Sequence, residues 1–149
     1  MNFKSLPTDS KFILAMTWQD YAPYYSDLET RPLDASSLNA WMEDWSALAA
    51  RVDEQFTRLQ VLTSQFTADE AIQKQFDAFV DQLQPAFKTA DQKIKEKLLA
   101  SGLQPKGYTV AFKMMQSEGK IFNTDNLPLL AEEQKLVTEY QKISGATTV

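Results

Sequence analysis

The sequence LNAWMEDWSALAARVDEQFTRLQVLT occupies residues 38–63 of a chain of 149 residues. Four of its apolar side chains recur every seven residues: Leu38, Trp45, Val52 and Leu59. Each of these four is followed by another apolar residue three or four positions later. This spacing aligns apolar side chains along one face of a helix of about 3.6 residues per turn. The stretch therefore predicts an amphipathic helix, about 40 Å long, with Ser36 or Ser37 as its N-cap.

The residues before this helix predict a shorter helix with a defined start and end. Thr17 has the side chain of an N-cap, and Trp18 opens a helix with Asp20 in its first turn. Pro23 falls within this helix and is expected to kink or shorten it. Arg31-Pro32 ends the helix, because a residue before proline avoids the helical conformation.

A long middle helix is predicted from its capping sequence and its apolar face. Thr67-Ala68-Asp69-Glu70 has the pattern of a capping box, in which the Thr hydroxyl and the Glu carboxylate each accept from a backbone amide. Apolar residues then follow on one helical face: Ile72, Phe76, Phe79, Leu83, Phe87, Ala90, Ile94 and Leu98. Pro85 lacks an amide hydrogen, so a kink is expected at residues 81–85. Ser101-Gly102 is expected to end the helix in a left-handed cap.

Two further helices are predicted in the remaining residues. One covers residues 108–118 and is ended by Gly119, and the other runs from about residue 126 to Ser144 and is capped by Gly145. The apolar stripe of the last helix consists of Leu130, Leu136, Val137, Tyr140 and Ile143.

Together these patterns predict an all-α fold. Five helices with short connections favour an antiparallel helical bundle with a long kinked middle helix. Residues 17–149 are interpreted as a single helical-bundle domain, and residues 1–16, which show little periodicity, as an extended lead-in.

The composition is that of one folded domain with limited chemistry. Hydrophobic residues make up 44% and aromatic residues 11% of the chain, which is enough material for a core. The net charge of −5 disfavours binding to nucleic acid phosphates or to anionic lipid. The chain has no cysteine and no histidine, so disulfides, thiol nucleophiles, imidazole bases and the usual zinc sites are excluded within it.

The N-terminal apolar run is short. Residues 12–16 (Phe-Ile-Leu-Ala-Met) are too few for the core of a signal peptide or for a membrane span. We therefore expect a soluble cytoplasmic protein.

Three groups of charged residues are candidates for catalytic or binding roles. Asp77 and Asp81 have the spacing of a carboxylate pair, but they lie opposite the apolar stripe and are interpreted as solvated. Glu132-Glu133 is interpreted as favourable charge at a helix N-terminus rather than as a metal ligand. The lysines at 88, 93, 95 and 97 alternate with acidic residues and indicate an exposed helix face rather than a phosphate groove.

Two groups of aromatic residues are candidates for binding roles. Trp41 and Trp45 lie on the apolar stripe, so core packing is favoured over a ligand cage. Tyr21, Tyr24 and Tyr25 cover two faces of a short helix, and one of them is a candidate for exposure at a partner surface. No catalytic, cofactor-binding or metal-binding residue is assigned.

The stretch from Asn126 to Val149 resembles the end of the N-terminal domain of oligoendopeptidase F-type zinc metallopeptidases, relatives of thimet oligopeptidase. The resemblance rests on Pro-Leu, Glu-Glu-Gln-Lys-Leu, Glu-Tyr-Gln-Lys-Ile and Gly-x-x-Thr-Val strings in this order. Other segments are similar to the opening and middle helices of that domain: residues 18–28, 31–33, 38–45, 79–85 and 97–101.

The resemblance implies a position in a larger enzyme. In that family the helical domain precedes a catalytic domain with a His-Glu-x-x-His zinc helix, and the two enclose a channel that admits short peptides. Since this chain has no histidine, no zinc ligand or general base is carried over to any of its residues. The implied partners are the catalytic domain of the same polypeptide, with its zinc, and short peptide substrates.

A second hypothesis is a free-standing helical module that binds a protein partner. Under the first hypothesis a surface normally covered by the catalytic domain would be left open. We then expect an apolar patch on the isolated chain, or self-association through it.

Overall fold

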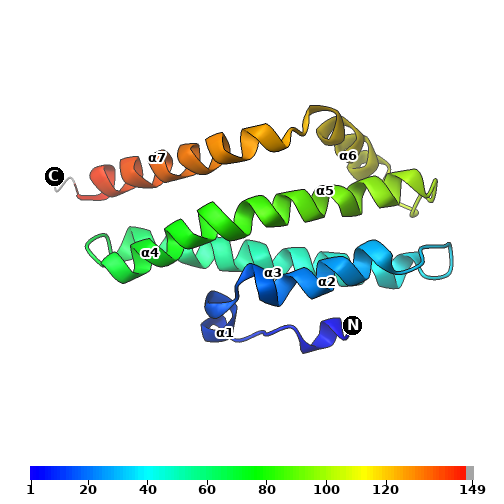
Figure 1. Ribbon diagram of the computed structural model, residues 1–149, viewed down its shortest axis with the longest axis horizontal. Helices are drawn as coiled ribbons and strands as arrows, with labels where there is room; N and C mark the ends of the chain where they lie inside the picture. The colour runs from blue at the N-terminus through cyan, green and yellow to red at the C-terminus, as the bar shows by residue number, and fades with distance from the viewer. Residues whose placement is uncertain (147–149) are drawn as a thin grey trace.

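The computed structural model describes residues 1–146, which contain helices and no strands (Figure 1). The α-helices are α1 (Ser10–Ala15), α2 (Trp18–Thr30), α3 (Leu38–Gln65), α4 (Glu70–Ala78), α5 (Gln84–Ala100), α6 (Thr109–Ile121) and α7 (Leu127–Ala146). A π-helical turn, η2 (Phe79–Leu83), joins α4 to α5, and two 3-10 turns are η1 (Phe3–Ser5) and η3 (Thr124–Asn126). The predicted all-α bundle is confirmed, and its five helices correspond to α2, α3, α4–η2–α5, α6 and α7.

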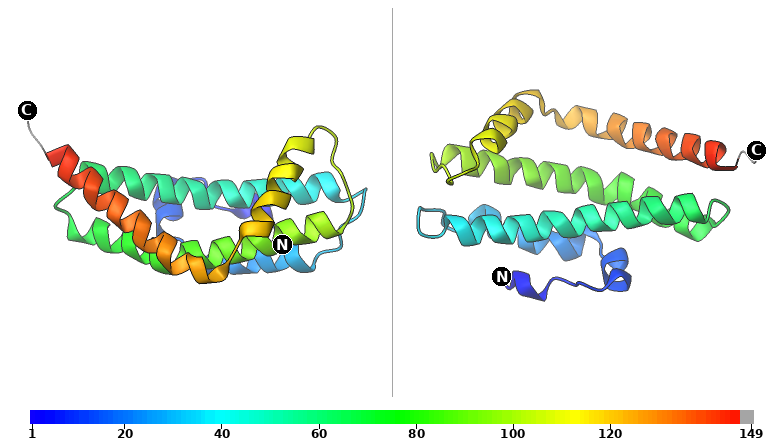
Figure 2. Two further views of the ribbon diagram at one scale, coloured as in Figure 1. Left: turned by 90° about the horizontal axis from the view of Figure 1, so that it is seen from above. Right: turned by 180° about the vertical axis from the view of Figure 1, so that it is seen from behind.

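The long helices lie side by side in alternating directions. Helix α3 packs against α2 and α4, and α5 packs against α2. Helix α7 lies along α3, α5 and η2 (Figures 1 and 2). Seen from above, α6 crosses α3 and α5 at one end of the bundle, and α7 crosses them obliquely toward the other end (Figure 2). The core therefore lies among α2, α3 and the α4–η2–α5 unit, with α6 and α7 on one side.

The predicted seven-residue repeat of α3 forms the centre of this core. The four repeat residues are all buried, as are Trp41 and Leu48 between them. Two buried positions on the same face are polar, Gln55 and Thr63. The Gln55 amide nitrogen donates to the Met16 carbonyl at 2.8 Å, and its oxygen accepts from Tyr21 at 3.1 Å. A polar side chain is tolerated in this core because both ends of its amide have partners.

Residues 1–16 are not the extended lead-in that was predicted. They form η1 and α1, and three of their apolar side chains are buried: Phe3, Leu6 and Ile13. The prediction was wrong because these segments are too short to show a helical period, while their apolar side chains gain stability from contact with the core.

The start and end of α2 agree with the prediction. Thr17 is the N-cap, and the Asp20 carboxylate accepts from the Thr17 amide at 2.7 Å. Arg31 follows the last helical residue in an extended conformation, as the proline after it requires. Pro23 lies within α2 and does not shorten it.

The predicted N-cap position of α3 is confirmed at Ser37, but the side chain that bonds the amides there belongs to Asp34. Ser37 is the N-cap by position, but its side chain makes no capping bond. The Asp34 carboxylate accepts from the Ser36 hydroxyl at 2.6 Å, the Ser36 amide at 2.8 Å and the Ser37 amide at 2.9 Å. These bonds, the Ser36 hydroxyl first, lower the pKa of Asp34 to about 2.

Acid should weaken the fold through Asp34. Because the folded-state pKa lies below the ordinary value of 3.8, the stabilising contribution is present above about pH 4 and is lost as the pH falls toward 2. Thermal unfolding of the parent chain and of Asp34→Ala, measured from neutral pH to pH 2, should show a difference in Tm that shrinks with acidity. A difference that stays constant over this range would contradict the assignment.

A correction also applies to the start of α4. Its N-cap is Asp69, whose carboxylate accepts from the amides of Ala71 at 2.9 Å and Ile72 at 3.2 Å. The predicted capping box began two residues earlier, at Thr67. The carboxylate of Asp69 bonds two amides at once, so the helix starts two residues later than the box predicts.

The predicted disruption by Pro85 takes the form of the π-helical turn. The Gln84 amide donates to the Phe79 carbonyl, five residues back rather than four. The break in α-helical bonding thus lies at Phe79–Leu83 and overlaps the predicted region 81–85. Phe79, Val80 and Leu83 are all buried in this turn. At the other end of α5, Gly102 has a φ of 69° and forms the predicted left-handed cap.

Two predicted helix ends were wrong because the glycines there lie inside helices. Gly119 is within α6, which continues to Ile121, and Gly145 is within α7. A Cβ atom at Gly119 would lie 3.3 Å from the Gln92 amide nitrogen, so the glycine allows α6 to approach α5 closely. Residues 147–149, the end of the string that carried the resemblance, lie outside the described residues. None of the described helices has the length and hydrophobicity needed to cross a membrane.

Candidate functional site

The two aspartates with the spacing of a carboxylate pair, Asp77 and Asp81, interact with different partners. Asp77 accepts from the Gln73 amide nitrogen at 2.9 Å, and Asp81 forms an ion pair with Lys135 of α7 at 2.6 Å. Asp81 thus links η2 to α7 through a surface ion pair. Within residues 1–146 no group of three or more His, Cys, Asp or Glu side chains is placed to hold a metal ion.

The lysines of α5 do not share one exposed face, contrary to the prediction. Only Lys93 is exposed, whereas Lys88, Lys95 and Lys97 are half-buried. Lys95 forms ion pairs with Asp91 at 3.1 Å and with Glu118 of α6 at 3.0 Å. Burial alone would lower the pKa of Lys95, but these two carboxylates raise it above its usual value.

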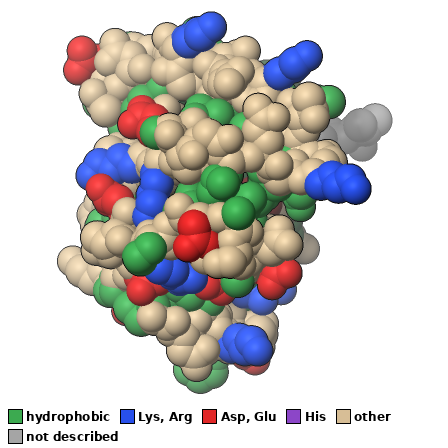
Figure 3. Space-filling model, turned by 90° about the vertical axis from the view of Figure 1, so that its right-hand side faces the viewer, with side chains coloured by type: hydrophobic (Ala, Val, Ile, Leu, Met, Phe, Trp, Pro, Cys, Tyr) green, Lys and Arg blue, Asp and Glu red, His purple; other side chains and the backbone are tan. Residues whose placement is uncertain are grey.

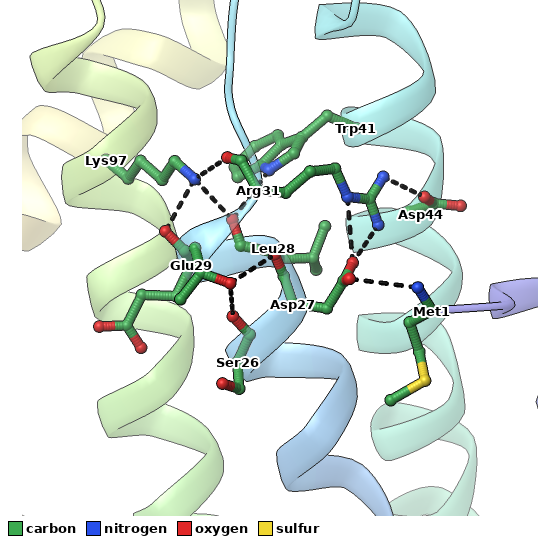
Figure 4. A network of polar contacts seen from close by, with 10 residues as sticks. Met1, Ser26, Asp27, Leu28, Glu29, Arg31, Trp41, Asp44 and Lys97 are labelled. Atoms are coloured by element: carbon green, nitrogen blue, oxygen red, sulfur yellow. Dashed lines mark hydrogen bonds and ion pairs between the residues drawn. The ribbon is translucent and has the colours of Figure 1, made fainter.

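Lys97 is the centre of a polar network at the end of α2 (Figure 4). Its ammonium group donates to the carbonyls of Leu28 and Glu29, each at 2.8 Å, and to the carbonyl of Arg31. A cation from α5 thus satisfies the carbonyl groups that a helix leaves unpaired at its C-terminus. The Leu28 carbonyl also accepts from the indole nitrogen of Trp41 at 3.0 Å.

Arg31 extends this network across the loop between α2 and α3. It donates to Asp27 at 3.0 Å and to Asp44 at 2.7 Å, and Asp27 also lies 3.1 Å from the ammonium group of Met1 (Figure 4). Burial would raise the pKa of Asp27, but these two cations lower it below its usual value. Every charge in this network has a partner, which indicates a structural role.

The two tryptophans are core residues, as predicted. Trp41 is completely buried, and its ring centroid lies 5.7 Å from that of Trp45. The indole nitrogen of Trp45 donates to Asp91 at 2.8 Å, so the indole nitrogens of both tryptophans have hydrogen-bond partners.

None of the three tyrosines is exposed, so the proposed partner surface on α2 was wrong. Tyr21 and Tyr25 are buried, and Tyr24 is half-buried against the ring of Phe3. The hydroxyl of Tyr25 is buried without a hydrogen-bond partner among the described residues. The Tyr25 ring lies between the ring of Trp18, stacked at 5.6 Å, and that of Phe87 at 5.9 Å.

The two buried tyrosines form a matched pair for mutation. Tyr25→Phe removes a hydroxyl without a partner and should raise the free energy of unfolding by about 1 kcal/mol. Tyr21→Phe leaves the Gln55 oxygen without its donor and should lower it by about 1–2 kcal/mol. Chemical denaturation of both variants measures the difference, and equal losses would contradict the absence of a partner at Tyr25.

Most of the exposed large apolar side chains among the described residues belong to α6 and α7. Helix α6 has no buried residue, and Val110 and Ile121 are 71% and 78% exposed. The predicted apolar stripe of α7 faces outward, with Leu136 at 65% and Tyr140 at 71% exposure. Figure 3 shows hydrophobic side chains interspersed with charged ones over the end of the molecule where α6 lies. The apolar patch stays a prediction, and these exposed side chains of α6 and α7 are the ones that it would comprise.

A groove lies beside this surface, above α3. A cavity of about 730 Å³ lies between α3 and α6 and is lined by Met42, Trp45, Tyr108 and Met115. A second cavity of about 450 Å³ adjoins it between α3 and α5, lined by Phe56, Phe87 and Lys88. Both share Ser46, Ala49 and Ala50 of α3. Small side chains on the floor and larger ones along the walls make a groove that is lined mostly by apolar residues. Helices α6 and α7 lie on this side of the bundle (Figure 2).

Comparison with known proteins identifies the family. Residues 15–122 match the family model described as Peptidase M3 N-terminal domain. The chain belongs to this family. No curated protein and no solved structure matches it.

The match to the M3 N-terminal domain covers the groove but not helix α7. It includes α2 to α6, and hence the α3 and α5 residues that form the floor and the α6 residues that form one wall. Helix α7 begins at Leu127 and lies beyond the matched residues. The surface with the most exposed apolar residues thus spans the last helix of the match and the helix that follows it.

Proposed function

We propose that this M3 N-terminal domain is the non-catalytic N-terminal part of a cytoplasmic oligoendopeptidase-type zinc peptidase. Its helices would form one wall of a channel that admits short peptides to a catalytic domain. The observation that carries the proposal is the match of residues 15–122 to the Peptidase M3 N-terminal domain.

Zinc does not fit the described residues of this chain. They hold no cluster of three potential ligands, and the whole sequence contains no histidine. In this proposal the zinc belongs to the catalytic domain, where it would activate the attacking water. The contribution of the helical domain is shape: it limits which peptides reach that centre.

The coding sequence and the catalytic domain provide two tests. Downstream of codon 149 we expect the reading frame to continue into a segment with a His-Glu-x-x-His motif. Removal of the helical domain from that enzyme should then allow cleavage of longer or folded substrates. A stop codon after codon 149, or an unchanged size limit, would contradict the proposal.

The alternative is a free-standing helical module that binds a protein partner. The tyrosines of α2 do not support it, since none of them is exposed. The exposed apolar residues of α6 and α7 do favour a binding surface. The purified chain with added zinc should not cleave a quenched peptide under either hypothesis, so the reading frame is what distinguishes them.

A further inference from the structure

Helix α7 presents to solvent an apolar stripe that includes two neighbouring exposed carboxylates, Glu132 and Glu133. Leu129, Leu136 and Tyr140 are 62%, 65% and 71% exposed. Glu133, also exposed, lies four residues after Leu129 and three before Leu136. These four side chains share one helical face, because residues three and four apart are neighbours on a helix. The stripe is suited to a binding surface that is apolar and offers a cation to Glu133.

Lys88 supplies such a cation in the groove. It lines the 450 Å³ cavity beside Phe56 and Phe87, and also a cavity of about 300 Å³ that Leu130 of α7 borders. The side chain is half-buried, and burial lowers the pKa of its ammonium group. Across the described residues 1–146 it forms no ion pair, in contrast to Lys95 of the same helix.

Within one copy the carboxylate of Glu133 does not form an ion pair with Lys88. Glu133 is near enough to act on the pKa of Lys88, but no oxygen of it lies within ion-pair distance, 4.0 Å. A half-buried ammonium group that has no ion pair is stabilised when a carboxylate reaches it. A second α7 entering the groove would bring such a carboxylate together with apolar side chains for the walls.

We propose that two copies of this chain associate symmetrically, with the Leu129–Tyr140 stripe of each α7 in the groove of the other and Glu133 paired with Lys88 across the interface. The groove and the stripe lie on the same side of the bundle, which is what a two-fold interface requires. The small floor residues, Ser46, Ala49 and Ala50, leave space for the entering side chains. This association does not depend on the proposed peptidase role.

Charge reversal tests the interface. Analytical ultracentrifugation of the 149-residue chain over a wide range of concentration should show a monomer–dimer equilibrium. Lys88→Glu and Glu133→Lys each place like charges across the interface, and each should weaken dimerisation by at least about tenfold. Lys93→Glu, an exposed position on α5 that pairs with Glu29 of α2 at 3.7 Å, is the matched control and should dimerise normally.

A mixture of the two single variants, Lys88→Glu and Glu133→Lys, separates contact between copies from contact within one copy. In a mixed dimer the two substituted side chains meet in one contact, and the unchanged Lys88 and Glu133 meet in the other. Both contacts then join opposite charges. The mixture should therefore recover dimerisation although neither variant dimerises normally alone, and circular dichroism confirms that both are folded.

Three results would overturn the proposal: a parent chain that stays monomeric, single variants that dimerise normally, or a mixture of folded variants that does not recover. A monomeric parent chain would leave the apolar face to the proposed catalytic domain, so the proposed function would stand.

Discussion

Replacing Trp41 with alanine should lower the free energy of unfolding by about 3–5 kcal/mol, the range for large aromatic side chains in a core. The Trp41 indole is completely buried, contacts Trp45 and donates to the Leu28 carbonyl at 3.0 Å. Its removal leaves a cavity at the centre of the core and deprives a carbonyl at the end of α2 of one donor. Denaturant unfolding followed by circular dichroism measures the loss.

The matched variant is Trp41→Phe. It keeps most of the apolar volume and loses the indole hydrogen bond, so its loss should be about 1 kcal/mol. The Leu28 carbonyl still accepts from Lys97 in this variant. A loss from Trp41→Phe as large as that from Trp41→Ala would show that the hydrogen bond, and not the packing, dominates at this position.

Lys97→Met should lower the free energy of unfolding by about 2–3 kcal/mol, because it removes a charged donor shared by three carbonyls while keeping a similar apolar stem. The affected carbonyls belong to Leu28, Glu29 and Arg31, at the last turn of α2 and the residue after it. Hydrogen exchange should show the loss as faster opening of this turn.

Lys93→Met is the control for Lys97, since Lys93 lies on the same helix with its side chain 56% exposed. Its effect should stay within about 0.5 kcal/mol. The double variant of Trp41→Phe and Lys97→Met should lose more than the sum of the single variants, because only then does the Leu28 carbonyl lose both side-chain donors. Additive losses would indicate that the two donors act independently.

The local sequence was sufficient to predict the helices and most of the core. Leu38, Trp45, Val52 and Leu59 are buried because their seven-residue spacing fixes them on one helical face, and this depends only on helix geometry. The same argument located the cap at Thr17 and the disruption near Pro85. The sequence pattern predicted that a helix ends at Gly119. The helix continues through this glycine instead, because its position depends on the distant contact of Gly119 with Gln92.

The polar interior could not be predicted in this way. Gln55 interrupts the apolar pattern of the α3 stripe, and only the approach of Tyr21 and Met16 explains its burial. Lys97 belongs to a run of alternating charges, and its role depends on the end of α2, which lies 66–69 residues earlier in the chain.

The surface of α7 shows another limit of sequence patterns. Periodicity predicts which side of a helix is apolar, but it does not predict whether the same chain covers that side. Among the described side chains of α7, Leu127, Ala131 and Thr138 are buried, while the predicted stripe faces solvent. The candidate groove could be inferred only once α6 and α7 were placed over α3 and α5.

The π-helical turn at Phe79–Leu83 has a consequence for how this helix tolerates changes in length. One residue of an α-helix turns the chain by about 100°, and a π turn accommodates one extra residue without breaking the rod. Deleting a single exposed residue such as Gln82 would remove that extra residue and restore regular winding, so the side chains of α5 would keep their orientation relative to α4. Ile94 and Leu98 would still face the core, and Lys97 the carbonyls it bonds. The irregular turn thus keeps the two halves of the helix in one rotational phase despite the extra residue, and a one-residue deletion there should leave the packing of α5 intact.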